Sequence, residues 1–538
     1  MTTLQPPPSV DEPRNQVGES FNRRSFLTLG LAGLATIPFA GCAANNSTQR
    51  RPNVVVFMAD DIGLGDIGFY HADRTGHDPV VPTPNIDQLI RDGIHFSNAY
   101  APSSLCAPTR FSMLTGNYPY RNSRDKPFGV WLPWNDPGIE PKNTTSARIA
   151  QKGGYATAFF GKWGCGGELR NAKTGQPMSE IDLGEFEFED FESLYKAANY
   201  HGFDYALELP RGIQSGPFAF FENGNWMPLE DGSRFGRVGP DQHLVGASLP
   251  PHSEVGDSNW NPATVGPLLA AKATEYIRSH TTDNPLQPFF MYYCSQGIHV
   301  PHVPSKTFGD KPIAKTTPSS HGDMLAELDA QVGALIDCLK ETHSYTDTLF
   351  VFTSDNGGLG SRWNSLAEFG HDGTNGLRGA KGAIYEGGAR VPFSCTWPTV
   401  IASGSESNEL VVAHDIVATI AAIADPSSPT DQVMDSLDLL PILSGKSVKE
   451  SHSVILQQSN KDNSYYAIRR GKWKLIFSGS KRGIDEGLQP IALFDLANNP
   501  GEHESLNKVG DAAYQDLVLE LSNLYLELRE SGRATVVS

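Results

Sequence analysis

The sequence is poor in cysteine and in basic residues, and it has no long hydrophobic run after residue 41. Its six cysteines contain no Cys-x-x-Cys pair, which excludes a dense disulfide framework and a zinc site of the usual spacing. Lys and Arg number 43 against 61 Asp and Glu, and the resulting net charge of −18 argues against nucleic acid or anionic lipid as the main partner. Charged residues make up only 19% and apolar residues 39%, which excludes a disordered chain. A length of 538 residues instead predicts roughly two to four domains with a large buried core.

The first 50 residues differ in composition from the rest. The pair Arg23-Arg24 precedes an apolar run at 27–39. This run is too short to cross a hydrocarbon core of about 30 Å, so it does not predict a transmembrane helix. A charged segment followed by a short apolar one predicts a signal peptide over 1–41, with a linker over 42–50. The arginine pair resembles a twin-arginine export signal.

We therefore expect an exported bacterial protein, located in the periplasm or at the cell surface. The sequence Ala-Gly-Cys ending at Cys42 resembles a lipoprotein cleavage box, and Cys42 would then be the lipidated first residue of the mature protein. The alternative is cleavage nearby with Cys42 unmodified.

Strand-like runs alternate with helical patterns along most of the chain. Continuous apolar and β-branched runs predict buried strands at Asn53–Met58, Ala156–Phe160, Pro288–Cys294 and Thr348–Thr353. Helical patterns are found at Asn85–Asp92, Ala263–Ser279, His321–Glu341 and Asp415–Ala424. This alternation predicts an α/β fold with a large, mostly parallel (mixed) sheet sandwiched by helices. In such a sheet, functional sites form at the carboxyl ends of the strands.

The pattern changes near residue 447. Tyr465–Arg469 and Trp473–Ser478 flank a short turn and predict a hairpin, and Asp511–Arg529 predicts an amphipathic helix. We therefore predict a main domain over 51–447 and a smaller C-terminal α+β domain over 448–538. Within the main domain, acids alternate with Phe at Glu185–Glu192, which predicts a half-buried strand with a solvated acidic face.

Polar side chains follow two of the predicted strands. Asp60 and Asp61 come after the first strand, and Asp355 and Asn356 come after a later one. If the two strand ends are adjacent, three carboxylates and one amide oxygen meet in one crevice. Such oxygen donors suit Ca²⁺ or Mg²⁺, and a divalent cation would relieve the repulsion between the carboxylates.

One cysteine stands in an unusual setting. Pro108 suits the first turn of a helix that runs to about Thr115, so Cys106 lies at or near the helix N-terminus, where an anion is favoured. Arg110 lies one turn further on and can reach back toward Cys106. A buried core thiol would not require Pro and Arg at these positions.

The sequence Cys106-x-Pro-Thr-Arg, followed by Leu-Thr-Gly, resembles the signature of type I sulfatases of the alkaline-phosphatase superfamily, in which the cysteine becomes formylglycine. The two acidic strand ends resemble the metal-ligand motifs of that family. Further resemblances lie at Phe160–Trp163, at Pro288 through His299-Val-Pro, at Leu377–Gly388 with Val391-Pro392, at Arg470–Leu475, at Leu493–Leu496 and at Asn499–Glu502. The matching motifs run in order from about 51 to 505.

The resemblance implies an alkaline-phosphatase-like fold, a sulfatase catalytic domain over 51–447 and a role for each matching residue. Ca²⁺ and formylglycine are the implied cofactors, and a formylglycine-generating or sulfatase-maturating enzyme is the implied partner. The implied calcium ligands are Asp60, Asp61, Asp355, Asn356 and the modified Cys106. Arg110 would support the formylglycine, and the sulfate would be held by Lys162, His299 and Lys381. A second His-Val-Pro-like segment makes His302 a rival for the role of His299.

The resemblance further implies hydrolysis of sulfate monoesters. Of the two hydroxyls of a hydrated aldehyde, one would attack sulfur with Asp355 as a proton acceptor, and the other would allow sulfate to leave by C–O cleavage. His299 or Lys381 would protonate the departing alcohol. The family usually has a histidine two residues after the Gly-Lys-Trp lysine, and here that position is Gly164. That histidine helps to break down the enzyme-bound sulfate, so Lys162 or water would replace it, or turnover would be slower.

We expect a sulfated carbohydrate or an aryl sulfate as substrate. The alternatives are a phosphomonoester, phosphodiester or phosphonate hydrolase on the same fold, and a weakly active protein that binds sulfated glycans. The excess of acids excludes a broad basic groove for densely sulfated chains. It leaves room for a small anion-binding pocket, which favours a terminal sulfate over the interior of a polymer.

Overall fold

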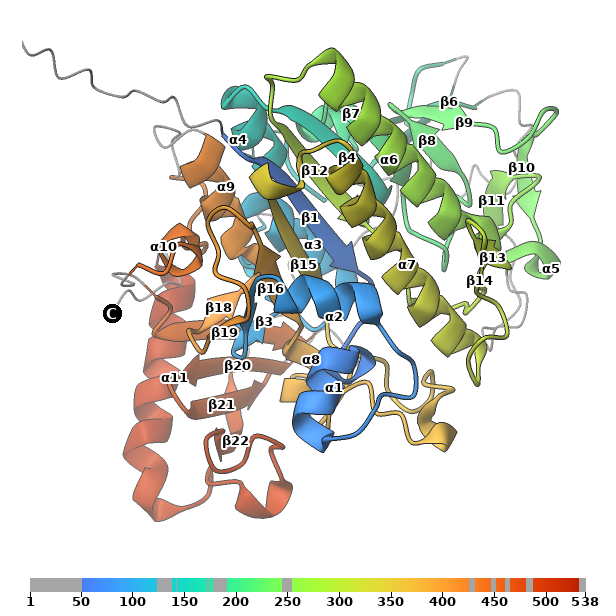
Figure 1. Cartoon of the computed structure of the whole chain (residues 1–538). Helices are drawn as coiled ribbons and strands as arrows, with labels where there is room; N and C mark the ends of the chain where they lie inside the picture. Colours follow the sequence, from blue (N-terminus) through green and yellow to red (C-terminus); the bar gives the residue numbers. More distant parts are fainter. Residues whose placement is uncertain are drawn as a thin grey trace, which may run out of the picture. The chain divides into compact units, whose positions relative to one another are not determined.

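Strands from distant parts of the chain pair as one mixed sheet in the computed structural model (Figure 1). Among the described residues this sheet has twelve strands. In spatial order they are β17 Ser405–Ser407, β2 Ile94–Phe96, β16 Phe393–Thr396, β15 Thr348–Ser354, β1 Asn53–Ala59, β12 Phe289–Cys294, β4 Ala156–Lys162, β7 Tyr205–Leu209, β8 Phe220–Glu222, β9 Asn225–Met227, β6 Phe191–Tyr195 and β5 Glu168–Asn171. The five central strands, β15 to β7, are parallel, and antiparallel strands extend the sheet on both sides.

The structure describes residues 51–122, 138–141, 143–171, 174–177, 191–243, 254–424, 431–446, 451–459, 465–479 and 487–531. The predicted signal peptide, Cys42 and the linker over 42–50 lie outside these ranges. So do the predicted domain boundary near 447 and most of Glu185–Glu192, although β6 begins at Phe191.

The central strand β1 is buried on both faces because its side chains alternate between two cores. Val54, Val56 and Met58 belong to the core on one face, and Val55 and Phe57 belong to the core on the other. None of these five side chains is more than 2% exposed. A strand with two buried faces requires the continuous apolar run that the sequence shows.

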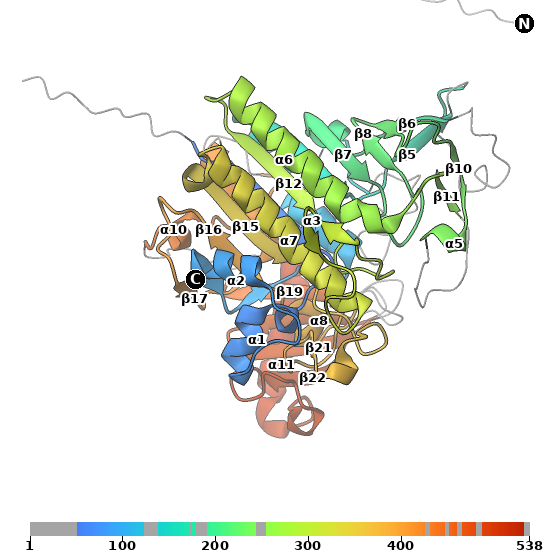
Figure 2. The ribbon, with the colours of Figure 1, turned by 45° about the vertical axis from the view of Figure 1, so that its right-hand side comes forward.

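Helices supply the outer layers of these two cores. One core contains apolar side chains of α3 (Cys106–Thr115), α4 (Ser146–Lys152) and α9 (Ile416–Ala424), and the other those of α2 (Pro84–Arg91), α6 (Val265–Asp283) and α7 (Ser320–Glu341). Figure 2 shows α6 and α7 side by side across one face of the sheet. The shorter helices are α1 Gly68–Thr75, α5 Pro240–His243, α8 Glu386–Ala389 and α10 Leu440–Leu443. The predicted α/β fold, with helices on both faces of a mostly parallel sheet, is thus confirmed.

The C-terminal part contains a separate antiparallel sheet. Its strands are β19 Val454–Ser459, β20 Tyr465–Arg470, β21 Trp473–Ser478 and β22 Gln489–Asp495, and α11 (Gln515–Glu530) packs on them. The predicted hairpin is confirmed, but the helix starts at Gln515 rather than at Asp511. The Asp511 side chain accepts a hydrogen bond from Ala513 N and caps a short 3₁₀ turn that precedes the helix. Short two-stranded ribbons are formed by β10 Phe235–Val238 with β11 Glu254–Asp257, β13 Thr307–Phe308 with β14 Lys311–Pro312, and β3 Ala99–Tyr100 with β18 Val411–Val412.

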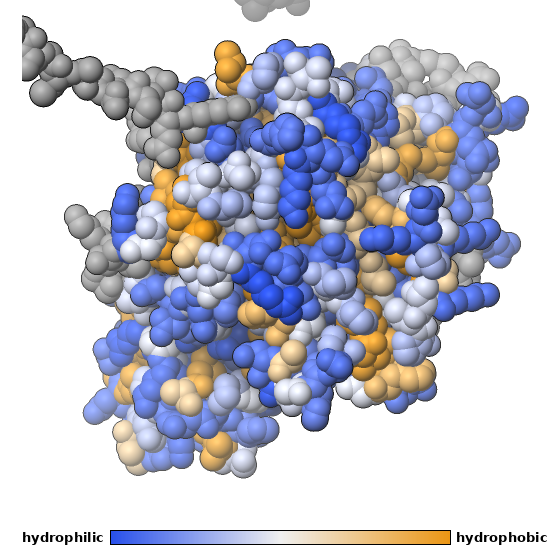
Figure 3. Space-filling model, viewed as in Figure 1, coloured by the Kyte–Doolittle hydropathy of each residue, from blue (hydrophilic) through white to orange (hydrophobic). Residues whose placement is uncertain are grey.

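Most of the surface seen in Figure 3 is hydrophilic, with smaller apolar areas between the polar side chains. Large apolar side chains that are well exposed, such as Leu286 and Leu519, are few among the residues described. Within the same ranges, no helix has both the length and the apolar character needed to cross a membrane.

A buried ionic cluster joins the small sheet to the main sheet's loops. Lys474 on β21 is 0% exposed, and its Nζ lies 2.9 Å from Oε1 of Glu386 and 3.0 Å from Oε1 of Glu502. The second oxygen of Glu386 accepts from Tyr100 Oη at 2.5 Å and pairs with Arg390 at 2.9 Å. Burial would raise the pKa of Glu386, but Lys474 and Arg390 lower it to about 2. The carboxylate is therefore ionised at neutral pH.

We predict that Lys474→Met lowers the free energy of unfolding by about 3–5 kcal/mol, because it removes the buried cation that pairs with Glu502 and one of the cations that pair with Glu386. Lys472→Met on the same hairpin is the matched control. Its side chain is 49% exposed and pairs with Asp495 at the surface, so we expect a loss below about 1 kcal/mol. Denaturant unfolding of the two variants measures the difference, and equal losses would contradict a supporting role for the cluster.

Candidate active site

Two neighbouring parallel strands deliver the predicted metal ligands to one point. Ala59 at the end of β1 is in register with Ser354 at the end of β15, so Asp60 and Asp355 are the next residues on adjacent strands. Asp60, Asp61, Asp355 and Asn356 are all 0% exposed. Asp61 N donates to Oδ1 of Asp355 at 3.2 Å, and Asn356 Nδ2 donates to Oδ1 of Asp61 at 3.0 Å. The two strand ends therefore form one cluster, as the sequence predicted.

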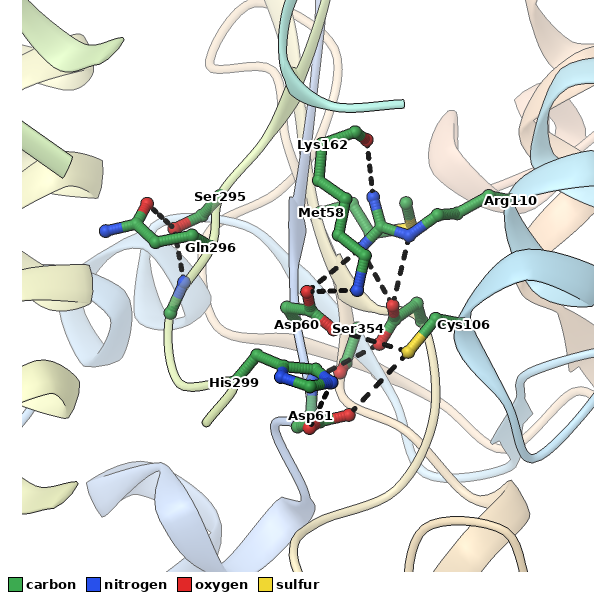
Figure 4. A network of polar contacts seen from close by, with 12 residues as sticks. Met58, Asp60, Asp61, Cys106, Arg110, Lys162, Ser295, Gln296, His299 and Ser354 are labelled. Carbon is green, nitrogen blue, oxygen red and sulfur yellow. Dashed lines mark hydrogen bonds and ion pairs between the residues drawn. The ribbon is translucent and has the colours of Figure 1, made fainter. Parts of the chain in front are cut away.

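Cys106 faces this cluster from the first turn of α3. Its Sγ lies 3.5 Å from Oδ1 of Asp60 and 3.9 Å from Oδ1 of Asp61 (Figure 4). It also lies 3.5 Å from Oδ1 of Asn356. Burial, assisted by the negative charge of Asp355, raises the pKa of the thiol far above its usual value. An unmodified Cys106 would thus be a neutral thiol and a weak nucleophile.

Arg110 reaches the cluster from the next turn of α3. Its guanidinium donates to Oδ2 of Asp355 through Nη2 at 2.8 Å and through Nε at 3.2 Å. The remaining nitrogen, Nη1, donates to the carbonyl of Lys162 at 2.8 Å, which connects α3 to the end of β4. At 1% exposure, Arg110 is a fully buried cation whose hydrogen bonds fix both a carboxylate and the Lys162 strand end.

Two lysines approach the cluster, one from the end of β4 and one from the loop after residue 377. Lys162 Nζ lies 2.7 Å from Oδ2 of Asp60, and Lys381 Nζ lies 2.7 Å from Oδ2 of Asp61. Burial would lower the pKa of Lys381, but the charge of Asp61 and its neighbours raises it above its usual value. Lys381 is therefore a cation, held at the mouth of the site with a side chain 18% exposed.

The structure places His299, rather than His302, at the cluster. His299 Nε2 lies 3.7 Å from Oδ2 of Asp61, and Nδ1 is held 2.7 Å from the carbonyl of Val300. Burial and the charge of Lys381 lower the pKa of His299 to about 4. His302 instead contacts the carbonyl of Ile298 at 3.2 Å and stacks on His321, with ring centroids 4.6 Å apart.

The three carboxylates differ in their affinity for a proton. Burial would raise the pKa of each, but the charges of Lys162 and Arg110 hold that of Asp60 well below its usual value. Lys381 likewise lowers the pKa of Asp61. For Asp355, burial and the repulsion from Asp60 prevail and raise the pKa to about 6. Asp355 is thus the carboxylate in the cluster that most readily accepts a proton.

The donor set fits a divalent cation. Ligand atoms from Asp60, Asp61, Cys106 and His299 all lie within 4.8 Å of one another. Adding the amide oxygen of Asn356 and the oxygens of Asp355 gives a set dominated by carboxylate and carbonyl oxygen, which suits Ca²⁺ better than a soft metal.

Two residues that no sequence pattern singled out hold the loop after Asp61. Asp66 accepts from Gly63 N at 2.7 Å, and its other oxygen lies 2.7 Å from His371 Nε2. Burial would lower the pKa of His371, but the contact with Asp66 raises it. Asp66 lies five residues after Asp61, so its position in the segment directly after the predicted metal ligands is the signal that could have indicated its role.

The backbone at Gly164 explains the departure from the family pattern. Gly164 has φ +66°, a left-handed conformation that favours glycine. A Cβ there would lie 2.8 Å from Cδ of Arg110, closer than real Cβ contacts allow. A histidine at this position would therefore displace Arg110 or require a different backbone path.

A buried cluster of carboxylates and cations around Cys106, at the carboxyl edge of a mostly parallel sheet, defines an enzyme that acts on an anionic ester. Comparison with known proteins specifies which ester. The family model "Sulfatase" matches residues 52–426, and the model "N-sulphoglucosamine sulphohydrolase, C-terminal" matches residues 379–531. The chain belongs to the sulfatase family and is an arylsulfatase-like hydrolase of sulfate esters.

Individual relatives match over nearly their whole length. The chain is 29% identical to N-acetylgalactosamine-6-O-sulfatase of Bacteroides thetaiotaomicron over 521 residues, covering 89% of this chain and 93% of the relative. It is 32% identical to human arylsulfatase A, covering 86% and 85%. A solved structure from a study of glycosaminoglycan metabolism by Bacteroides thetaiotaomicron superimposes with a TM-score of 0.72 at 27% identity, covering 90% of this chain and 100% of that one.

We predict that Gly164→Ala lowers kcat/KM about 10- to 100-fold, because the added Cβ pushes Arg110 away from Asp355. Gly175→Ala is the matched control, since Gly175 has φ +65° and nothing within 4 Å of an added Cβ. Both variants pay a similar backbone cost of about 1 kcal/mol, but only the first disturbs Arg110. Rates of sulfate release and melting temperatures distinguish the two effects, and equal rate losses would refute the role given to Arg110.

Proposed function

We propose that this enzyme removes sulfate from a sulfated carbohydrate, using a formylglycine derived from Cys106 and a bound Ca²⁺. The observation that carries the proposal is the position of Cys106 Sγ, 3.5 Å from oxygens of both Asp60 and Asn356. The names of two relatives support the substrate class: one acts on N-acetylgalactosamine 6-sulfate groups, and the other comes from a study of glycosaminoglycan metabolism.

The two cofactors would supply what the chain lacks. Formylglycine would provide a hydroxyl nucleophile at the position of the Cys106 side chain, and Ca²⁺, held by Asp60, Asp61, Asp355 and Asn356, would neutralise negative charge there. A plain thiol with a raised pKa provides neither, which supports the need for modification.

The chain's own residues would bind and orient the sulfate. Lys162 and Lys381 lie on the two carboxylates that flank Cys106, so an anion next to Cys106 would meet both ammonium groups. Arg110 keeps Asp355 in place through two hydrogen bonds. Asp355, the carboxylate whose pKa burial and Asp60 raise in the metal-free protein, would accept the proton of the nucleophile.

Lys381 is better suited than His299 to donate a proton to the leaving alcohol. The Nδ1–H of His299 donates to the Val300 carbonyl, so Nε2 can donate only when the ring is protonated, and the pKa of about 4 disfavours that form in the free enzyme. Lys381 carries its protons at neutral pH. His299 would bind the sulfate, whose negative charge favours the protonated ring.

We also propose that the protein is exported before it acts, as the pattern over 1–41 predicts. A formylglycine-generating or sulfatase-maturating enzyme would modify Cys106 before α3 packs, because in the folded chain Cys106 is only 8% exposed.

We predict that active protein contains an aldehyde at position 106. Peptide mass spectrometry after unfolding and alkylation should find Cys165 as an alkylated thiol, whereas residue 106 should resist alkylation and react with a hydrazide probe.

Cys106→Ala should release no sulfate, and a chelator should stop the wild-type enzyme and lower its melting temperature. A wholly alkylatable Cys106 in active enzyme would refute the mechanism, and a strong preference for aryl phosphate over aryl sulfate would refute the substrate class.

We predict that His299→Ala lowers kcat/KM for a small aryl sulfate by at least about 100-fold, because Nε2 faces the sulfate position beside Asp61. His302→Ala should lower it less than about 10-fold, since this ring contacts Ile298 and His321 instead. Steady-state kinetics of the two variants on the same substrate measure both losses of kcat/KM. A larger loss for His302→Ala than for His299→Ala would assign the role to His302.

A further inference from the structure

A pocket of about 330 Å³ begins at Val300, the residue after His299. Three segments form its walls: the loop after β12 with His302, the start of α7 with Ser319 and Ser320, and the segment 361–365. The last segment belongs to the loop that follows Asp355 and Asn356. Since β12 and β15 both flank β1, their loops converge beside the cluster around Cys106.

The walls of this pocket are held in place before any ligand arrives. Ser365 Oγ donates to Ser319 Oγ at 3.1 Å and ties the 361–365 segment to α7. The ring of His302 is fixed by its contact with Ile298 and by stacking on His321, which is 1% exposed. The volume lies at the lower end of the range of about 300–1,000 Å³ typical of small-ligand sites, which suits one sugar ring.

The charge of the lining is unusual for this chain. None of the described residues that line the pocket is acidic, although the chain as a whole carries a net charge of −18. The cation in the lining is Arg362, which is exposed and lies over the ring of Trp363 at 4.6 Å. Among the described residues none forms an ion pair with its guanidinium, whose exposed N–H groups could donate to a ligand.

We propose that this pocket binds the sugar unit next to the one that carries the scissile sulfate, and that Arg362 binds an anionic group on that unit. The substrate would then be an oligosaccharide with a second anionic group, either a carboxylate or another sulfate, both of which accept the two parallel hydrogen bonds of a guanidinium. The hydroxyls of Ser320 and Ser361 supply further hydrogen-bond partners for a sugar. This inference rests on the proposed function, because it assumes that sulfate is released beside Cys106.

The test compares wild type, Arg362→Ala and Arg362→Lys on four substrates. They are a 6-sulfated hexosamine alone and the same residue linked to a neutral hexose, to a uronic acid or to a sulfated hexose. Arg362→Ala should lower kcat/KM about 10- to 100-fold for one or both of the doubly anionic disaccharides and less than about twofold for the other two substrates. Arg362→Lys should retain part of the wild-type kcat/KM, because lysine keeps the positive charge but cannot form the two parallel hydrogen bonds of a guanidinium.

Arg278→Ala is the matched control. Arg278 is also exposed, and it pairs with Glu341 at the opposite end of α7, roughly 30 Å away, so its loss should change none of the four rates. If Arg362→Ala lowers kcat/KM only for the disaccharide with the uronic acid, the ligand of Arg362 is a carboxylate. If it lowers kcat/KM only for the disaccharide with the second sulfate, the ligand is a sulfate. Equal losses on all four substrates, or no loss on any, would overturn the assignment of Arg362.

A binding measurement separates this inference from the proposed function. Calorimetric titration of Cys106→Ala protein with the same disaccharides requires no turnover, and the doubly anionic ones should bind more weakly when Arg362→Ala is added. If wild type releases no sulfate from any ester, the proposed function fails, but the titration still tests the pocket. If wild type releases sulfate and the titration shows no effect of Arg362, only the further inference fails.

Discussion

The structure around the site depends on the balance of charge among three buried carboxylates and three buried or half-buried cations. Asp60, Asp61 and Asp355 are 0% exposed, and such a group of anions would not persist in a low-dielectric interior without partners. Each partner comes from a different part of the chain: Arg110 from α3, Lys162 from the end of β4 and Lys381 from the loop after 377. The need for neutralisation therefore fixes how these elements meet at the edge of the sheet.

The small C-terminal sheet completes this arrangement. Ser459 on β19 donates to the carbonyl of Gly382, next to Lys381, and the carbonyl of Gln458 accepts from Ser104, two residues before Cys106. Lys474 pairs with Glu386, the first residue of α8, which follows the loop that carries Lys381. The C-terminal sheet thus contacts both the segment that carries Cys106 and the segment that carries Lys381, and the family model for this part, which begins at 379, includes Lys381.

The features that the sequence predicts and the features that it does not predict have different physical origins. Strand ends such as Asp60-Asp61 and Asp355-Asn356 are predictable because apolar runs mark buried strands and the polar residues follow directly. The close approach of Gly164 to Arg110 was not predictable, because it depends on a positive φ and on a side-chain path between distant segments. The pocket at Arg362 and the Asp66–His371 contact likewise join loops that carry no recognisable motif and meet only through the order of the strands.

Net charge and local charge lead to different conclusions about substrate. A chain with a net charge of −18 repels polyanions at long range, yet solvent ions screen exposed charges beyond about 10 Å, so the groups that matter are those within reach of the bound ester. There, three carboxylates are balanced by Arg110, Lys162 and Lys381, and His299 is neutral because its pKa is lowered. Any divalent cation added to this balanced set makes the site positive. On the proposed function, attraction for sulfate would thus be confined to a small volume in a chain of negative net charge, and discrimination among sulfated molecules would fall to the adjoining loops rather than to a basic groove.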